Sequence, residues 1–372
     1  MVLVIAPDLR ARGGISAVMR VLSSGGLFDA RRGPHPRACV PSVDAREPKE
    51  TFEVRHFASA RDGSLAGKFL FSLYRLAIFA VTRLSRPSLV HVHTSTGVSF
   101  LRKSAYVWLA SLKGARILLH IHPGEFWDQL ESAGVLRRRA VMSALRRSDG
   151  IVVLTEVIAR KARSVTTGVE ISVLPNAVNL KELAIHPRPA REEALIAFLG
   201  WYVKSKGAFD LLEALVTVHI RCPEMRAVFG GWKGSSTLKN RVRTLGLADV
   251  VDIQGWLGRD EVTSLLSRCT VFVLPSYTEG VPMVILEAMG CGAPIVTCPV
   301  GGIPDVAIEG RNAVYVRPGD IQALAETLLH ILNDEKARTE MSRANLMDAR
   351  RYDVTVVIKE LRGRYEKYLV GN

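Results

Sequence analysis

The sequence has few cysteines, no long apolar run and no tract of low complexity. The 372 residues include five scattered cysteines, with no Cys-x-x-Cys pair among them: Cys39, Cys222, Cys269, Cys291 and Cys298. An odd, dispersed set of this kind predicts reduced, buried thiols rather than a disulfide framework. The apolar stretch 2–6 is too short for the core of a signal peptide. Together these features predict a cytoplasmic protein.

Several signatures of common enzyme chemistry are also missing. There is no cysteine and histidine spacing typical of a structural zinc site, no Gly-x-x-x-x-Gly-Lys-Ser/Thr loop and no Gly-x-Ser-x-Gly elbow. P-loop phosphotransfer and serine-hydrolase chemistry therefore have no candidate residues. With 48% hydrophobic and 23% charged residues, the composition is that of a globular protein rather than of a disordered or many-span membrane protein.

Acidic residues are scarce in only one half of the chain. The formal net charge is +14, and residues 1–190 hold 28 Lys and Arg against 14 Asp and Glu, whereas residues 191–372 hold 22 of each. A basic half joined to a neutral half indicates that the two halves meet different molecules. Anionic membrane, phosphorylated substrate and nucleic acid all fit the charge. Nucleic acid fits least, because no recognition module or aromatic-interleaved basic stripe is present.

Short apolar stretches alternate with glycine, proline or asparagine breaks and with helical segments, which predicts an α/β architecture of parallel strands. The length suggests two domains, and residues 180–191 lack periodicity and form the expected linker. Two doubly wound sheets joined there would leave a cleft at the carboxyl ends of the strands. Strands are expected at 2–6, 89–93, 116–122, 151–154, 171–174, 195–200, 226–230, 251–255, 271–274, 294–297 and 313–316.

The apolar segment 68–86 fits two different structures. It is rich in Phe, Leu and Ile but is interrupted by Arg75 and Arg83, and it falls short of the roughly 20 residues of a membrane span. We expect a packed core helix. A helix lying on a membrane surface is the alternative.

The segment 271–290 carries the densest chemistry. A strand is expected to end at Pro275, and a loop then carries Glu279 and Gly280. A helix is expected to begin near Pro282, where a missing N–H does no harm. Backbone N–H groups at such a helix start favour a phosphate. The carboxylates of Glu279 and Glu287 would then grip hydroxyls on two sugars that flank a diphosphate.

This segment resembles the motif of two glutamates separated by seven residues in retaining glycosyltransferases of the GT-B fold, in particular family 4 of the bacterial surface polysaccharide type. The resemblance spans nearly the whole chain and is strongest from 195 to 320. It implies an α/β GT-B fold, with two Rossmann-like doubly wound parallel-sheet domains at 1–188 and 189–350 and a C-terminal helix at 351–372 that crosses back to the first domain. Similar stretches lie at 13–15, 175–178, 206–214, 292–296 and 300–305.

The resemblance also implies roles for single residues in the second domain. Glu287 would bind the ribose hydroxyls of the nucleotide, and Glu279 would contact the transferred sugar. Gly280, Val281 and Met283 would offer backbone N–H groups to the sugar and the diphosphate.

Positive charge for the departing diphosphate would come from Lys206 and from the helix that follows it. Relatives commonly carry an arginine directly after the preceding strand glycine, where this chain has Trp201. Lys204 either replaces that arginine or has no role. In the first domain, Gly13 and Gly14 resemble the family's glycine loop beneath the donor phosphates.

The stretch 120–126 resembles the family's histidine segment near the reacting centre. His120 and His122 point the same way by strand alternation, and we favour His122 because it lies beside the loop. His91 and His93, on an earlier strand, are expected in the core or the cleft wall.

The resemblance therefore implies a retaining, metal-independent hexosyltransferase that uses a nucleotide diphosphate sugar and a polyprenyl-diphosphate-linked or other lipid-linked acceptor. No Asp-x-Asp occurs, so the metal-diphosphate site of one-domain glycosyltransferases has no candidate, and neither a metal nor a cofactor is expected. The basic clusters 137–139 and 146–147 predict peripheral attachment to an anionic membrane, at the inner face of the plasma membrane. A nucleotide-sugar epimerase of the same fold and a non-catalytic nucleotide-sugar or lipid-binding relative are the alternatives.

Overall fold

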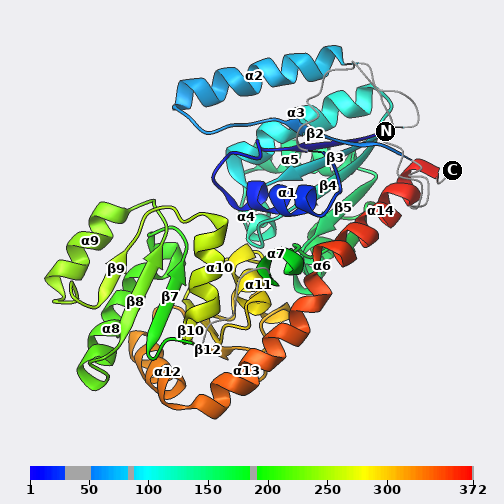
Figure 1. The fold of residues 1–372 in the computed structure, drawn as a ribbon. Helices are drawn as coiled ribbons and strands as arrows, with labels where there is room; N and C mark the ends of the chain where they lie inside the picture. Colours follow the sequence, from blue (N-terminus) through cyan, green and yellow to red (C-terminus); the bar gives the residue numbers. More distant parts are fainter. Residues whose placement is uncertain (30–51, 83–87, 185–190, 371–372) are drawn as a thin grey trace. The chain divides into compact units, whose positions relative to one another are not determined.

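The computed structural model describes residues 1–29, 52–82, 88–184 and 191–370. Its chain forms two compact units, Met1–Asn176 with Val354–Asn372 and Ala177–Asp353 (Figure 1). The first division follows Asn176 rather than residue 188, because the short helix α7 (Leu180–Ala184) packs against a helix of the second unit. Cys39, residues 83–87 and residues 185–190 of the expected linker lie outside the described residues.

The first unit contains a six-stranded parallel sheet with the strand order β2-β1-β3-β4-β5-β6. Every strand that the sequence predicts in this half is present. The sequence did not predict β2, because the polar residues Arg55 and His56 interrupt its five residues, which therefore lack the continuous apolar character of a central parallel strand. The strands are β1 (Val2–Ala6), β2 (Val54–Ala58), β3 (Leu89–Thr94), β4 (Arg116–Ile121), β5 (Gly150–Val153) and β6 (Glu170–Val173).

Helices pack on this sheet in two groups. The helix α3 packs on β3 and β4 and contacts both α2 and α5, whereas α14 packs on β3 and contacts α1. Tyr365 of α14 is completely buried. The helices of this unit are α1 (Gly14–Ser24), α2 (Leu65–Val81), α3 (Gly97–Leu112), α4 (Phe126–Glu131), α5 (Val135–Arg146), α6 (Glu156–Val165) and α14 (Val354–Val370).

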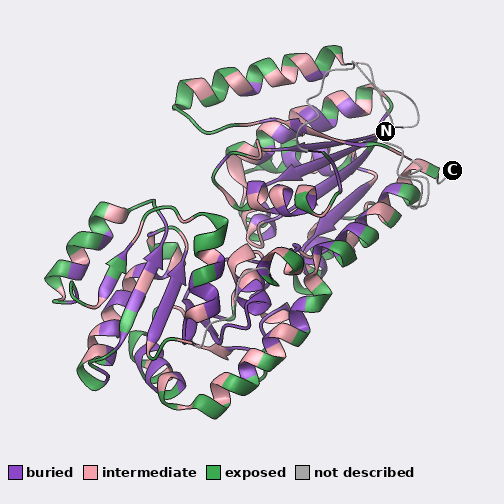
Figure 2. Ribbon diagram, in the orientation of Figure 1, coloured by how far each residue is buried: buried purple, intermediate pink, exposed green. Residues whose placement is uncertain are grey.

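The expectation of a packed core helix at 68–86 is wrong. Residues 68–81 lie in α2, but within this helix only Ser72 and Phe79 are buried, and Figure 2 colours most of its ribbon as exposed or intermediate. Its large apolar side chains are more than half exposed at Leu65, Phe69, Leu70, Leu73, Tyr74 and Val81. Composition alone misled the prediction, because apolar residues surround this helix instead of forming one inward stripe. None of the helices in the described ranges is both long enough and apolar enough to cross a membrane.

The second unit contains another six-stranded parallel sheet, with the order β12-β11-β10-β7-β8-β9. All the strands predicted for this half are present. Chain order reverses between β7 and β10, which makes this point the expected ligand-binding edge of a doubly wound sheet. The strands are β7 (Leu195–Leu199), β8 (Arg226–Gly230), β9 (Val251–Ile253), β10 (Val271–Leu274), β11 (Ile295–Thr297) and β12 (Val314–Tyr315).

Helices and short 3₁₀ turns connect these strands. They are η1 (Lys204–Lys206), α8 (Ala208–Arg221), α9 (Ser235–Thr244), α10 (Arg259–Arg268), α11 (Met283–Gly290), η2 (Ile303–Asp305), α12 (Ile321–Asn333), α13 (Glu335–Asp348) and η3 (Ala349–Tyr352). The cysteines within the described residues are reduced and buried, as predicted: Cys222, Cys269, Cys291 and Cys298.

Burial of His56 on β2 gives the fold a measurable sensitivity to acid. Its Nε2 lies 3.1 Å from the carbonyl oxygen of Pro7, and burial lowers the pKa of His56 from 6.5 to about 4. The unfolded chain takes up a proton near pH 6.5, whereas the folded chain resists it until about pH 4. The protonation of His56 therefore leaves the free energy of unfolding unchanged well above pH 6.5. It lowers that free energy by up to about 3 kcal/mol as the pH drops from 6.5 toward 4.

We predict that His56→Gln, which retains an N–H for Pro7, removes this part of the pH dependence. Urea unfolding at pH 7.5 and at pH 4.5 should show a loss of stability about 2 kcal/mol smaller in the variant than in the wild type. The same loss in both proteins would contradict the prediction.

Candidate functional site

Lys206 and Glu279 meet where β7 and β10 end. Lys206 closes the turn η1 after β7, and Glu279 lies on the loop after β10. Lys206 Nζ is 2.5 Å from Glu279 Oε1, with side-chain exposures of 27% for the lysine and 7% for the glutamate. Ser276, which is completely buried, donates its hydroxyl to the same oxygen at 2.8 Å. A nearly buried carboxylate is thus held by one cation and one hydroxyl.

Gly207 lets the loops after β7 and β10 approach closely. Its φ is 69°, and a Cβ added there would lie 2.1 Å from the carbonyl oxygen of Pro275. Next to it, the backbone N–H of Tyr277 donates to the carbonyl oxygen of Ser205 at 2.9 Å. Both the left-handed backbone and the short approach require glycine at position 207.

A third loop, after β11, supports Glu279 from its backbone side. Gly301 has a φ of 58°, and an added Cβ would lie 1.8 Å from the carbonyl oxygen of Glu279. Gly302 N–H donates to the carbonyl oxygen of Gly280 at 2.8 Å. Since β7, β10 and β11 are neighbours in the sheet, loops from three adjacent strands fix the position of one carboxylate.

Two helices begin beside this cluster. The helix α8 starts at Ala208, directly after Gly207, and α11 starts at Met283, directly after Pro282. Helix starts present unpaired N–H groups and partial positive charge, which suits an anion. Glu287 lies on α11 four residues after Met283 and is half-buried, so it shares a helix face with Met283.

The remaining predicted residues of this unit are distributed around the cluster. Gly280 and Glu279 are consecutive, Val281 is buried, and Lys204 at the start of η1 is exposed. The structure therefore brings together Lys206, Glu279 and the residues that lead into α11. Within the part of the chain that the structure describes, the Lys204 ammonium makes no ion pair or hydrogen bond.

The predicted residues of the first unit form separate groups. Gly13 precedes α1 and Gly14 begins it. His122 follows β4, and its Nε2 lies 2.9 Å from Nδ1 of His93. Burial lowers the pKa of His122 to about 3, so the ring is neutral at physiological pH. His91 and His93 are completely buried.

Two tryptophans at the edge of the second sheet were missed by the sequence analysis. Trp201, Trp232 and Trp256 follow β7, β8 and β9, and they are 38%, 44% and 44% exposed. Because these strands are parallel neighbours, the three side chains lie along the same edge. Each is preceded by glycine, so a repeated Gly-Trp pair after successive strands was the available signal.

Trp201, seen in the sequence only as the replacement of an arginine, belongs to this aromatic set. The ammonium of Lys233 lies 4.9 Å from the centroid of its ring, within the range of a cation–π contact. Positive charge is therefore present at the position that lacks the arginine, although a different residue supplies it.

Known protein families match both units. A family described as "Glycosyl transferase 4-like domain" matches residues 4–177, and "Glycosyl transferases group 1" matches residues 182–346. A D-inositol 3-phosphate glycosyltransferase of Corynebacterium aurimucosum is 28% identical over 46% of this chain and 42% of its own length.

A second relative, from Campylobacter jejuni, is named N,N'-diacetylbacillosaminyl-diphospho-undecaprenol alpha-1,3-N-acetylgalactosaminyltransferase. It is 30% identical over 30% of each chain. The chain thus spans less than half the length of these relatives.

Among solved structures, Anabaena HepE in complex with UDP and glucose superimposes with a TM-score of 0.70 at 15% identity. The match covers 98% of this chain and 99% of that one. Together with the two six-stranded parallel sheets, this likeness confirms the predicted fold of two Rossmann-like domains.

Two glycines with the same φ allow the cost of backbone strain to be measured apart from the cost of a steric clash. Gly207 and Gly310 both have a φ of 69°, but nothing lies within 4 Å of a Cβ added at Gly310. We predict that Gly310→Ala costs about 1 kcal/mol of unfolding free energy, whereas Gly207→Ala costs at least about 3 kcal/mol because the backbone of Pro275 must move. Equal losses in urea unfolding would show that the loop contact carries no constraint.

Proposed function

Because the chain belongs to the group 1 glycosyltransferases, we propose that it transfers a hexose from a nucleotide diphosphate sugar to a lipid-linked glycan, with retention of anomeric configuration. The observation that carries this proposal is the Lys206–Glu279 pair at the carboxyl ends of β7 and β10, with α8 and α11 beginning beside it. Cation, carboxylate and helix starts are the groups that a sugar diphosphate needs.

The donor diphosphate would take over Lys206 as its counterion. Before binding, Glu279 holds the ammonium in place, so little reorganisation is needed when the phosphate arrives. The Glu279 carboxylate would then accept hydrogen bonds from hydroxyls of the sugar, while the hydrogen bond from Ser276 keeps this carboxylate oriented. Backbone N–H groups of Gly280, Val281 and Met283 would face the sugar and the phosphates.

Nucleoside binding would use α11 and the loops that follow β7, β8 and β9, at the same edge of the sheet. Glu287 would accept the ribose hydroxyls, and the tryptophan edge formed by Trp201, Trp232 and Trp256 offers flat apolar surface for a base. HepE was solved with UDP and glucose, which supports a nucleotide-linked sugar as the donor class for this chain.

The reaction proceeds, in this proposal, by front-face attack. The bond between the sugar C1 and the diphosphate oxygen breaks, the acceptor hydroxyl oxygen bonds to C1 on the same face, and its proton passes to the departing diphosphate oxygen. Lys206 and the helix starts stabilise the charge that develops there, without a metal or a cofactor. Gly13, Gly14 and His122 keep the roles that the resemblance gives them, at the donor phosphates and the sugar.

The acceptor side of the proposal rests on the first unit. Arg137, Arg138, Arg139 and Arg146 on α5 are exposed, and the last three of them, with neighbouring residues, line an open hollow of about 600 Å³. Arg147 differs, because its guanidinium lies 3.2 Å from the ring centroid of Trp108 and donates to Ser143 at 2.7 Å. Four arginines of α5 are thus available for an anionic surface, and Arg147 has a structural role.

Membrane attachment would combine these arginines with the exposed apolar side chains of α2. The Campylobacter relative carries a diphospho-undecaprenol acceptor in its name, which supports a lipid-linked acceptor here. We place the enzyme at the cytoplasmic face of the plasma membrane, where nucleotide sugars and such lipids meet.

The donor site is tested with Lys206→Ala, and with Lys239→Ala on α9 as a matched control at an exposed lysine. Loss of one preorganised charge at the departing group should lower kcat/KM about 10² to 10³-fold and weaken nucleotide diphosphate binding in calorimetry. The control should retain both. Lys204→Ala, assayed alongside, decides whether that lysine replaces the missing arginine.

The assay combines UDP- and GDP-sugars with extracted lipid acceptors, and NMR reports the anomeric configuration of the product. We expect a product of retained configuration and strongly reduced transfer by Lys206→Ala. Conversion of the sugar nucleotide without acceptor would assign the chain to the epimerases. Nucleotide binding without turnover, together with indifference to Glu279→Ala, would identify a non-catalytic relative.

The membrane side is tested by replacing Arg137, Arg138, Arg139 and Arg146 with glutamine. At about 1 kcal/mol per basic residue near an anionic leaflet, affinity for phosphatidylserine vesicles should fall by up to about 10³-fold, while nucleotide binding is unchanged. The control removes four exposed charges of the second unit, at Lys239, Arg243, Lys336 and Arg343. Equal loss of vesicle binding in both variants would overturn the assignment of this surface.

A further inference from the structure

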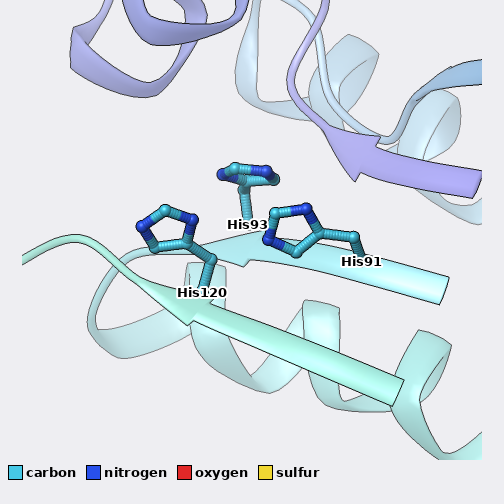
Figure 3. Close-up of side chains that lie close together, drawn as sticks. All are labelled: His91, His93 and His120. Carbon is cyan, nitrogen blue, oxygen red and sulfur yellow. The ribbon is translucent and has the colours of Figure 1, made fainter. Parts of the chain in front are cut away.

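Three buried histidines converge in the first unit. His91 and His93 lie on β3, and His120 lies on the neighbouring strand β4, where it is the register partner of His93 (Figure 3). Alternate residues of a strand share one face, so all three rings gather on the same side of the sheet. Their exposures are 0%, 0% and 3%, and one ligand atom from each lies within 4.8 Å of the others.

The hydrogen bonds of these rings leave a defined set of nitrogens without partners. His91 Nδ1 lies 2.7 Å from the hydroxyl of Tyr365, and His93 Nδ1 lies 2.9 Å from His122 Nε2. Within the described residues, His91 Nε2, His93 Nε2 and both nitrogens of His120 have no partner. Buried polar atoms are rarely left unpaired, because each costs about 1–3 kcal/mol.

We propose that His91, His93 and His120 bind one zinc ion or a similar transition-metal ion. Imidazole nitrogens suit Zn²⁺, Co²⁺, Ni²⁺ and copper, whereas Mg²⁺ and Ca²⁺ prefer oxygen ligands. A zinc–nitrogen distance of about 2.1 Å requires ligand atoms about 3.4 Å apart. The ligand atoms lie within 4.8 Å of one another, so binding would draw them closer by up to about 1.4 Å.

The partners of the two β3 histidines fit this proposal. A metal-binding histidine usually engages its second nitrogen in a hydrogen bond that fixes the ring, and Tyr365 and His122 provide such bonds to His91 and His93. His122, at 8% exposure, lies at the carboxyl end of β4 and is the least buried ring of the cluster. An ion would enter from that end.

Metal binding would also determine which ring nitrogen of His122 carries the proton. With Nε2 of His93 on the metal, the proton of His93 stays on Nδ1 and is donated to His122 Nε2. His122 then carries its own proton on Nδ1. This consequence concerns catalysis and rests on the proposed function, whereas the metal site itself does not.

The test uses the tag-free, full-length protein after dialysis against chelator. We expect calorimetry with ZnCl₂ to show one ion per chain with a Kd in the micromolar range or tighter, CoCl₂ to produce the visible absorption of a nitrogen-ligated site, and MgCl₂ to show neither. His120→Gln should weaken Zn²⁺ binding at least 100-fold. Tyr365→Phe, which keeps all three ligands, should weaken it about 10 to 100-fold.

His56→Gln is the control, because it removes a half-buried histidine of the same sheet and should bind Zn²⁺ like the wild type. Circular dichroism and nucleotide binding verify that each variant is folded. If His120→Gln does not fold, the Co²⁺ spectrum of the wild type and the Zn²⁺ affinity of Tyr365→Phe test the proposal instead. Absence of one-to-one binding in the wild type, or unchanged binding in folded His120→Gln, overturns the proposal. Nucleotide binding is independent of this site, so failure here leaves the proposed function standing.

Discussion

A carboxylate removed from water needs partners, and Glu279 has two of them, the Lys206 ammonium and the Ser276 hydroxyl. Removing one member of such a pair leaves a buried charge, at a cost on the order of 3–5 kcal/mol. The surrounding backbone is shaped accordingly. Gly207 and Gly301 take left-handed conformations at distances from Pro275 and Glu279 that no Cβ permits. The donor site we propose follows from this constraint. If Glu279 turns toward a sugar, the Lys206 ammonium needs another anion as its counterion, and a diphosphate can provide one.

The charge asymmetry of the sequence corresponds to a division of chemistry between the two units. The second half of the chain has no net charge, and in its unit the positive charge of Lys206 is balanced by the negative charge of Glu279. The first unit carries exposed arginines on α5 and exposed apolar side chains on α2. Exposed apolar side chains are costly in water unless something covers them. In the proposed account an anionic bilayer would cover α2 and attract the arginines.

Periodicity was a good guide to the sheets, because central parallel strands are continuous apolar runs. It failed at β2, whose edge position permits His56 and Arg55, and at α2, where apolar content did not reveal which face is buried. The 271–290 segment could be predicted because its residues are close in sequence. The resemblance implied a role for Lys206 at the diphosphate, but its contact with Glu279, 73 residues away in sequence, is seen only in the structure. The pairing of His93 with His120 depends on strand register, which no sequence pattern states.

The most direct test of the donor site is amide hydrogen exchange of the full-length protein with and without a nucleotide diphosphate sugar. The proposed contacts predict slower exchange in peptides that cover residues 201–210 and 276–287, because the ligand would occupy the N–H groups at the starts of α8 and α11. Peptides from α12 and α13 should be unchanged. Saturating ligand that leaves 201–210 and 276–287 unprotected would contradict the account.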